Sequence, residues 1–305
     1  HGDLHLRNIV LRNKEPTLFD AIEFDDRLAS IDILYDLAFL LMDLWHRDLK
    51  AHANLCFGTY VSRMERVGEL DGLAALPAFL SVRAAVRAMV AIDKMAVTGD
   101  IDLQEGRREV DEYFTLAMQF LRPEKPSLIA IGGFSGTGKT TVSAALAPQT
   151  GRAPGALHLR SDVERKRMAG VLPLERLPPE SYTKSASNKV YQRLFDRAGH
   201  ALSAGHSVIV DAVFQQASER RGIEQVAARS QVPFFGFWLQ APQEQLIERV
   251  SRRTNDASDA DVDVVSAQLA RQAKVACWQA IDASDCAADV AGRISAVVRS
   301  KLNSS

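Results

Sequence analysis

The sequence has few of the features that mark secreted, disulfide-stabilised or membrane-spanning proteins. It contains only three cysteines in 305 residues, Cys56, Cys277 and Cys286. Their number is odd and they form no metal-ligand pattern, which argues against a disulfide framework and a cysteine-based metal site. No apolar run approaches the roughly 20 residues that cross a bilayer, and no signal peptide is visible. We therefore expect a cytoplasmic protein without a membrane partner.

A large net charge is also missing. The formal net charge is -1, so no global field attracts nucleic acid or an anionic membrane. The apolar fraction of 47% and the charged fraction of 25% are ordinary for a globular protein, and the length favours two domains. Because the chain begins with His1 instead of Met, we expect a fragment or a processed product.

The first part of the chain has mainly helical periodicity. Residues 9–11 and 17–19 are typical of two short strands around a polar turn. From Asp32 to Met118 apolar residues recur at helical spacing. This predicts a helix that begins near Asp32 and further helices over 51–67, 77–97 and 104–120.

The second part alternates strands and helices. The proline-containing, charged segment 122–127 is the best linker, which divides the chain into domains 1–121 and 128–305. Strands are predicted over 128–132, 156–160, 207–211, 232–239 and 278–282. Helices are predicted over 139–147, 162–169, 183–204, 217–230, 242–254, 261–274 and 285–302. The alternation predicts an α/β fold with a parallel sheet between helices, preceded by a mostly helical domain.

A phosphate-binding loop lies between the first strand and the first helix of the second part. The string GFSGTGKT fits the G-x-x-x-x-G-K-[ST] pattern, with the strand and helix that this pattern requires on either side. Its backbone N–H groups and the helix N-terminus suit the phosphates of ATP. We predict that the cofactor is bound by Gly133, Ser135, Gly136, Thr137, Gly138, Lys139, Thr140 and Thr141, and that Lys139 also acts in catalysis.

Two residues are candidates for binding Mg²⁺ beside the phosphates. The hydroxyl of Thr140 can ligate the ion. Asp211 ends the apolar strand 207–211 and fits the second carboxylate position of such sites. The alternative for Asp211 is an aspartate that caps a strand end.

An acid follows the second strand of this part. Ligands of open parallel sheets bind beyond the carboxyl ends of the strands, which would place Asp162 opposite the terminal phosphate. Asp162 could then accept a proton from an acceptor hydroxyl, and Arg165, one turn later, could hold the acceptor. The alternative is that Ser161 or Asp162 only caps the helix that begins there.

An arginine-rich segment precedes a polar loop near residue 255. Arg249, Arg252 and Arg253 can lie on one helical face, and guanidinium groups suit the charge of a transferring phosphoryl group. We predict that they act in catalysis and that the following loop is a lid. The alternative is a solvated basic helix face.

Taken together, these strings resemble a known group of proteins. The order GGFSGTGKTT, RSDVERKRMAG, VIVDAVF and ERVSRRTNDASDAD is similar to small P-loop kinases of the zeta-toxin, gluconate-kinase and shikimate-kinase group, over about residues 127–300. The resemblance implies that Asp162 and Arg165 contact the substrate and that the three arginines contact phosphate. It does not imply a particular acceptor.

The N-terminus carries a second string with catalytic spacing. Asp3 and Asn8 in HGDLHLRN have the separation of the catalytic aspartate and the Mg²⁺-binding asparagine of a kinase catalytic loop. With the later DLA string, residues 1–120 resemble the aminoglycoside phosphotransferase and choline-kinase-like family. The resemblance gives Asp3 a catalytic role and Asn8 a metal-binding role. It also implies a metal-binding acid at Glu23, with Asp20 and Asp25 as rivals.

The nucleotide-covering lobe of that family would precede the catalytic loop, so we expect residues 1–120 alone to transfer no phosphate. The combination of both parts also resembles a bacterial two-domain family of predicted kinases. The leading hypothesis is an ATP- and Mg²⁺-dependent kinase that phosphorylates a hydroxyl group of a small molecule. The alternatives are an ATP-dependent regulatory module and a polynucleotide 5′-end kinase, for which the sequence offers no clear basic groove. The acceptor and the oligomeric state are not predicted.

Overall fold

The chain forms two compact units, and each is described by itself. The computed structural model describes residues 1–25, 30–98, 103–253, 256–270 and 277–303. The first unit comprises His1–Met64, Asp71–Glu124 and Arg152–Pro154. The second comprises Glu65–Leu70, Lys125–Gly151 and Gly155–Ser305.

The first unit opens with a small hairpin, as the sequence predicts. A short 3-10 helix, Leu6–Asn8, leads into β1 (Ile9–Arg12), which pairs antiparallel with β2 (Glu15–Leu18). Asn13 and Lys14 form the turn with φ of 52° and 67°, in the left-handed region. The strands lie one or two residues from their predicted positions.

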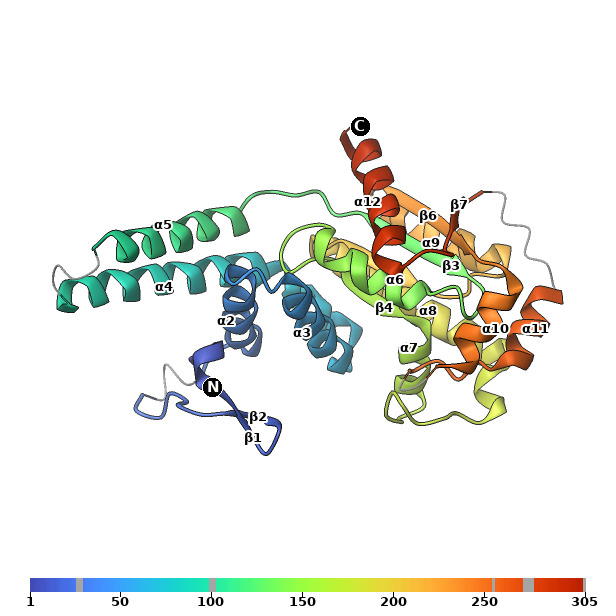
Figure 1. Ribbon diagram of the computed structural model, residues 1–305, viewed down its shortest axis with the longest axis horizontal. Helices are drawn as coiled ribbons and strands as arrows, with labels where there is room; N and C mark the ends of the chain where they lie inside the picture. The colour runs from blue at the N-terminus through green and yellow to red at the C-terminus, as the bar shows by residue number, and fades with distance from the viewer. Residues whose placement is uncertain (26–29, 99–102, 254–255, 271–276, 304–305) are drawn as a thin grey trace. The chain divides into compact units, whose positions relative to one another are not determined.

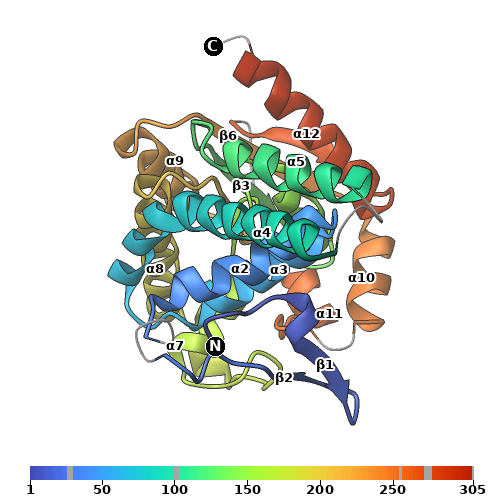
Figure 2. The ribbon, with the colours of Figure 1, turned by 90° about the vertical axis from the view of Figure 1, so that its left-hand side faces the viewer.

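Helices make up the rest of this unit. They are α2 (Ile33–His46), α3 (Lys50–Arg63), α4 (Leu76–Thr98) and α5 (Leu103–Phe120). A 3-10 helix, Val67–Ala75, precedes α4, and its residues 67–70 belong to the second unit. Asp32 caps α2 by accepting a hydrogen bond from the backbone N–H of Leu34 at 2.7 Å. Helices α4 and α5 run side by side in both ribbon views (Figures 1 and 2). The helical character predicted for residues 32–120 is therefore confirmed for the described residues of this range.

One helical stretch of this region is long and apolar enough to cross a membrane by composition. It spans Val67–Ala96 with a mean hydropathy of 1.6 over its most apolar window, 44% of which is buried in the protein. This stretch differs from the expectation that no apolar run approaches the length of a membrane span. A core helix of a globular protein passes the same test, so composition alone is weak evidence for a membrane span.

The second unit is built on a five-stranded parallel sheet. Its strands are β3 (Leu128–Gly133), β4 (Leu157–Arg160), β5 (Val208–Asp211), β6 (Phe234–Gln240) and β7 (Gln279–Asp282). Their order across the sheet is β4-β5-β3-β6-β7, and every neighbouring pair is parallel. The predicted parallel sheet is thus confirmed, including the strand near residue 280.

Helices cover both faces of this sheet (Figure 1). They are α6 (Lys139–Leu146), α7 (Ser161–Met168), α8 (Lys184–Ser203), α9 (Ala217–Arg229), α10 (Gln243–Ser251), α11 (Val262–Ala270) and α12 (Ala287–Asn303), with short 3-10 helices at Ala147–Gln149 and Pro179–Tyr182. Helices α6 and α12 pack against Ile129, Ile131 and Phe237 of the sheet in one buried apolar cluster. Helices α8 and α9 contact the sheet at β5 and β6.

Three predicted helices differ from the observed ones by three or more residues at their C-terminal ends. The predicted helix 51–67 is observed as α3, which ends at Arg63, four residues before the predicted end. Helix α10 ends at Ser251, with Arg252 as its C-cap, three residues before the predicted end. The predicted helix 261–274 is observed as α11 up to Ala270, and residues 271–274 lie outside the described part of the chain.

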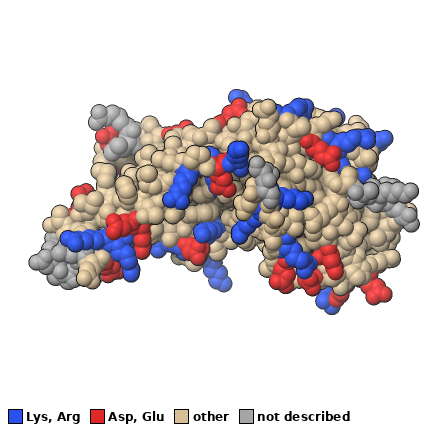
Figure 3. Space-filling model, turned by 90° about the horizontal axis from the view of Figure 1, so that it is seen from above, with Lys and Arg blue, Asp and Glu red and all other residues tan. Residues whose placement is uncertain are grey.

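The surface matches the small net charge of the chain. On the face shown in Figure 3, basic and acidic side chains lie close to one another in small mixed groups between areas without charge. Such a surface has no extended field of one sign on that face to attract a polyanion.

Candidate functional site

A cavity of about 1420 Å³ opens where β3, β4 and β5 end. All of its lining residues belong to the second unit. It is lined by every predicted loop residue except Gly133, namely Ser135, Gly136, Thr137, Gly138, Lys139, Thr140 and Thr141. Gly133 ends β3, at the base of the loop. This is the position at which parallel sheets bind ligands.

Glycines set the shape of the loop that leads into α6. Gly136 and Gly138 have φ of 87° and 84°, a conformation that other residues rarely adopt. A Cβ atom on Gly136 would lie 2.6 Å from the carbonyl oxygen of Leu246, so the loop packs tightly onto α10. Gly138 is the N-cap of α6 and supplies no side-chain cap. The unpaired N–H groups and the dipole of α6 therefore face the cavity and favour an anion there.

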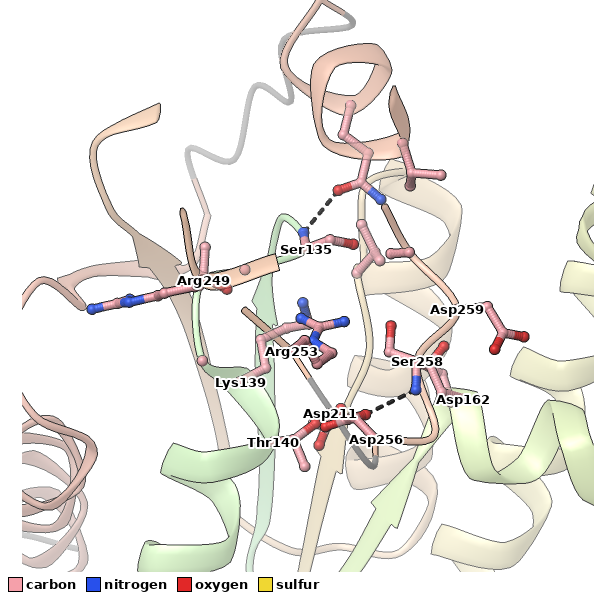
Figure 4. A pocket seen from close by; sticks show the side chains of 18 of the residues that line it. Ser135, Lys139, Thr140, Asp162, Asp211, Arg249, Arg253, Asp256, Ser258 and Asp259 are labelled. Carbon is pink, nitrogen blue, oxygen red and sulfur yellow. Dashed lines mark hydrogen bonds between the residues drawn. The ribbon is translucent and has the colours of Figure 1, made fainter. Parts of the chain in front are cut away.

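Lys139 begins α6 and lies among acids. Its Nζ atom donates a hydrogen bond to the carbonyl oxygen of Phe134 at 3.0 Å. Burial lowers the pKa of Lys139, while the charges of Asp211 and Asp162 act against this shift. Figure 4 shows Lys139 in the cavity together with Arg253, Asp211 and Asp162.

Asp211 ends β5 and is held by a histidine of the neighbouring strand. The Nε2 atom of His158 lies 2.7 Å from Oδ2 of Asp211, which is 4% exposed. Burial acts to raise the pKa of Asp211, but the His158 hydrogen bond and the charges of His158, Arg160 and Lys139 outweigh it and lower the pKa. Asp211 is thus an ionised carboxylate at neutral pH.

An ionised oxygen ligand fits a hard divalent cation. The side chains of Thr140 and Asp211 both line the cavity (Figure 4), so these residues fit the predicted Mg²⁺ site. Within the described residues, no group of three or more His, Cys, Asp or Glu side chains is placed to hold a metal by itself. A metal at Asp211 would therefore need the phosphates or water as further ligands.

Asp162 lies in the first turn of α7 and does not cap it. The N-cap is Arg160, without a side-chain cap bond, so the capping alternative for Ser161 and Asp162 does not hold. Burial raises the pKa of Asp162 and the charge of Asp211 adds to this, while a hydrogen bond with the Ser258 side chain acts in the opposite direction. A carboxylate with a raised pKa is a stronger base than an ordinary aspartate.

Arg165 lies in the same wall of the cavity, but its guanidinium group is already engaged. Nη1 donates to the carbonyl oxygen of Ser181 at 2.6 Å, and the group lies over the ring of Tyr182 at 4.8 Å. Ser187 at the start of α8 is 3.4 Å from Nη2. Arg165 therefore shapes this wall, and its predicted contact with an acceptor stays a prediction.

The three predicted arginines all line the cavity, but their side chains do not lie on one helical face. Arg249 donates to the carbonyl oxygens of Ala283 and Ser284 at 3.0 and 3.2 Å, so it binds the loop before α12. Arg252 pairs with Glu248 and its side chain is 80% exposed. Arg253 lies beside Lys139 (Figure 4), and its Nη1 atom is buried without a hydrogen-bond partner among the described residues. The reason is that α10 ends at Ser251, so Arg252 and Arg253 follow a different path from Arg249.

The segment after these arginines is fixed to α7. Asp256 pairs with Arg160 at 3.1 Å, and Asp259 pairs with the buried Lys166 at 2.9 Å. Asp259 also accepts hydrogen bonds from Tyr182 and from the backbone N–H of Leu177. Residues 256–259 of the predicted lid are therefore bound over the cavity, and residues 254 and 255 lie outside the described part.

The predicted N-terminal residues lie in the first unit. Asn8 donates hydrogen bonds to the backbone oxygen and to Oδ2 of Asp3 at 3.0 and 3.1 Å, so these two residues are adjacent. Glu23 is exposed. The roles of Asp3, Asn8 and Glu23 stay predictions.

Sequence reasoning missed three residues of the site: His158, Ser258 and Gln268. His158 contacts Asp211, Ser258 contacts Asp162, and Gln268 of α11 accepts a hydrogen bond from the backbone N–H of Ser135 at 2.8 Å. Each lies far along the chain from its partner, and none belongs to the phosphate-loop pattern. The alternation of polar and apolar residues in the strand LHLR is the signal that could have identified His158.

Comparisons with known proteins give a family match within the second unit. Residues 128–276 match the model of the AAA domain family. Uncharacterized proteins of Mycobacterium tuberculosis and Mycobacterium bovis are 29% identical over 277 residues, which is 90% of this chain and 53% of each relative. The chain thus spans about half the length of the curated relatives it matches. The resemblance of residues 1–120 to aminoglycoside phosphotransferases stays a prediction.

Three solved structures illustrate the similarity in fold. A gluconokinase from Sinorhizobium meliloti has a TM-score of 0.39 and 19% identity, over 59% of this chain and 99% of that one. A tunicamycin resistance protein from Deinococcus radiodurans has a TM-score of 0.42 and 20% identity, over 57% and 95%. The Mycobacterium tuberculosis APS kinase in complex with AMPPNP and APS has a TM-score of 0.39 and 15% identity, over 58% and 99%.

The parallel sheet, the glycine-rich loop after β3 and the match of residues 128–276 agree with one another. The C-terminal part of this chain has an AAA-type P-loop nucleotide-binding fold.

Proposed function

We propose that the second unit is an ATP-dependent kinase that transfers the terminal phosphoryl group of Mg-ATP to a hydroxyl group of a small molecule. The observation that carries this proposal is that one cavity contains both the phosphate loop and Asp162, a carboxylate whose pKa is raised. A module that only binds nucleotide needs the phosphate loop, but it does not need a basic carboxylate such as Asp162 beside it.

Each residue has a distinct part in this reaction. The loop amides of residues 136–140 and Lys139 bind the phosphates, and Arg253 faces the charge that develops on the transferring group. Thr140 and Asp211 would hold Mg²⁺, which neutralises phosphate charge when bound. Asp162 orients the acceptor hydroxyl and accepts its proton. The bound segment 256–259 restricts the entry of water.

The acceptor enters beside Asp162, between α7 and the start of α8. That wall carries Arg165, Tyr182 and Ser187. A cavity of this size accommodates a nucleotide with a second small molecule.

The test is phosphoryl transfer from labelled ATP to a panel of sugars, sugar acids and aminoglycosides by the purified chain. We expect a phosphorylated product that requires Mg²⁺. Lys139→Ala should bind ATP poorly and form no product, while Asp162→Asn should still bind ATP. Two results together would refute the kinase assignment. The first is a rate of ATP hydrolysis that stays the same with every acceptor of the panel, and the second is an Asp162→Asn variant that hydrolyses ATP as fast as the wild type. Transfer to oligonucleotide 5′ ends instead would identify a polynucleotide kinase.

A further inference from the structure

Helix α11 is joined to the phosphate loop by one side-chain hydrogen bond. The backbone N–H of Ser135 donates to Oε1 of Gln268 at 2.8 Å, although 133 residues separate them. Figure 4 shows this bond at the side of the cavity opposite Asp211 and Thr140. A backbone N–H must be the donor, so the acceptor is unambiguously the side-chain carbonyl of Gln268.

Apolar contacts hold the same elements together. Leu246 and Val250 of α10 and Val265 of α11 form a small buried cluster, against which Phe134 of the loop packs. Phe134 directly precedes Ser135, so the loop contacts α10 and α11 through a side chain and through the backbone. The apolar contacts set the distance between the elements, whereas the Gln268 bond is directional and fixes the orientation of Ser135.

These two helices carry the lid segment between them. Arg253, Ser258 and Asp259 lie in the connection between α10 and α11, and Ser258 reaches Asp162. Helix α10 packs on the phosphate loop where Leu246 lies against Gly136. The ion pair of Asp259 with Lys166 holds the middle of the connection. The far end of the connection, at α11, is fixed to the loop by Gln268.

We propose that Gln268 is a positioning residue: its hydrogen bond to Ser135 keeps α11 and the attached segment over the phosphates, and so determines how much phosphoryl transfer goes to the acceptor and how much to water. This inference rests on the proposed kinase function. A single N–H has one hydrogen, so the Ser135 amide is committed to Gln268, and the phosphates are bound by the later amides of the loop. Loss of the bond leaves only the apolar cluster to hold α11 against the loop, so the orientation of α11 is less well fixed and water reaches the phosphates more readily.

The test compares Gln268→Met, which has nearly the same size but no acceptor, with Gln268→Glu, which keeps an acceptor oxygen. The first readout is hydrogen exchange of the Ser135 amide, which needs no enzymatic activity. We expect about five- to tenfold faster exchange in Gln268→Met and protection in Gln268→Glu. Gln243→Met, at an exposed position of α10, is the matched control and should not change the exchange.

The second readout is the ratio of acceptor phosphorylation to ATP hydrolysis. Gln268→Met should lower this ratio severalfold with little change in the KM for ATP, and an effect on packing alone would not shift the ratio in this way.

Unchanged Ser135 exchange in Gln268→Met, or equally fast exchange in both variants, would overturn the proposal even if the chain proves not to be a kinase. If Gln268→Met does not fold, fast exchange in Gln268→Glu decides against it. Changed exchange without any phosphorylated acceptor would leave the hydrogen bond established and refute only the kinase function.

Discussion

His158 and Asp211 lie on neighbouring parallel strands, and their side chains form a hydrogen bond of 2.7 Å between Nε2 and Oδ2. Asp211 is the proposed metal ligand. His158 is paired with Ile209 in the register of β4 and β5, so it reaches Asp211 diagonally across the sheet, while Arg160 lies directly opposite Asp211. The bond occupies one carboxylate oxygen and leaves the other for a cation. Partners of this kind orient metal ligands.

The first prediction concerns this bond. His158→Phe removes the hydrogen bond and leaves a ring of similar size. We expect the Mg²⁺ concentration for half-maximal turnover to rise by about 10- to 100-fold, because Asp211 loses its fixed orientation. The measurement is turnover as a function of Mg²⁺ at saturating ATP, with the exposed His52→Phe of α3 as control. An unchanged Mg²⁺ requirement would show that His158 only fills space.

The second prediction separates catalysis from stability at Asp162. Its pKa is raised in the folded protein, so folding is favoured below the unfolded pKa of about 3.9 and this contribution is lost as the pH rises through the folded value. At pH 7 the ionised carboxylate therefore costs stability. We expect Asp162→Asn to raise the melting temperature at pH 7 while lowering kcat by about 10²- to 10⁴-fold.

The pH profile of kcat gives the matching readout for Asp162. A base must be deprotonated, so activity should fall as the pH is lowered, and a raised pKa places this fall at a higher pH than for an ordinary aspartate. Thermal unfolding of Asp162→Asn at pH 7 is the companion measurement. A melting temperature below that of the wild type would contradict the assigned direction of the pKa shift.

Local patterns were sufficient to predict the elements and the phosphate loop. The string from Gly133 to Thr140 combines the pattern with the strand and helix that it requires, so no long-range information was needed. The strand over β7 and the helices of the first unit also follow from periodicity alone. The ends of helices were less certain, and α10 ends three residues early because Arg252 serves as its C-cap.

Contacts that depend on strand order or helix packing could not be predicted. His158 contacts Asp211 only because β4 lies next to β5, an order that no local pattern contains. Gln268 reaches Ser135 only because α11 packs on the loop. The different directions of Arg249 and Arg253 likewise follow from the point where α10 ends. Motifs therefore predicted which residues gather at the cavity, and tertiary packing determined their partners.

The third prediction ranks the three arginines. Arg253→Met should reduce kcat most, by roughly 10²- to 10³-fold, because Arg253 lies beside Lys139, where we propose that the phosphates bind. Arg249→Met should mainly raise the KM for ATP, because it loosens the loop at Ala283 and Ser284. Arg252→Met should change neither, because an exposed pair with Glu248 contributes little. Steady-state kinetics of the three variants provides the test, and equal losses of kcat would contradict the ranking.

The fourth prediction concerns the pair between the buried Lys166 and the partly buried Asp259, with 2.9 Å between Nζ and Oδ1. Asp259→Asn leaves the Lys166 charge buried without its partner, which should lower the free energy of unfolding by about 3 kcal/mol at pH 7. The double variant Lys166→Met with Asp259→Asn should recover part of this loss, because no unpaired charge remains. Urea unfolding followed by the fluorescence of the buried Trp238 and Trp278 measures both.

Acid provides an independent check of the same pair. Burial acts to raise the pKa of Asp259, but its hydrogen bonds with Tyr182, Lys166 and Leu177 outweigh this and lower the pKa. The pair therefore stabilises the fold above the unfolded pKa of about 3.9, and this stabilisation is lost as the pH falls through the lower folded value. The difference between wild type and Asp259→Asn should thus shrink below about pH 4. Glu248→Gln, which breaks the exposed pair with Arg252, should show no such loss at either pH. A difference at Asp259 that stays constant down to that pH would mean that the charge of Asp259 does not hold the segment over the cavity.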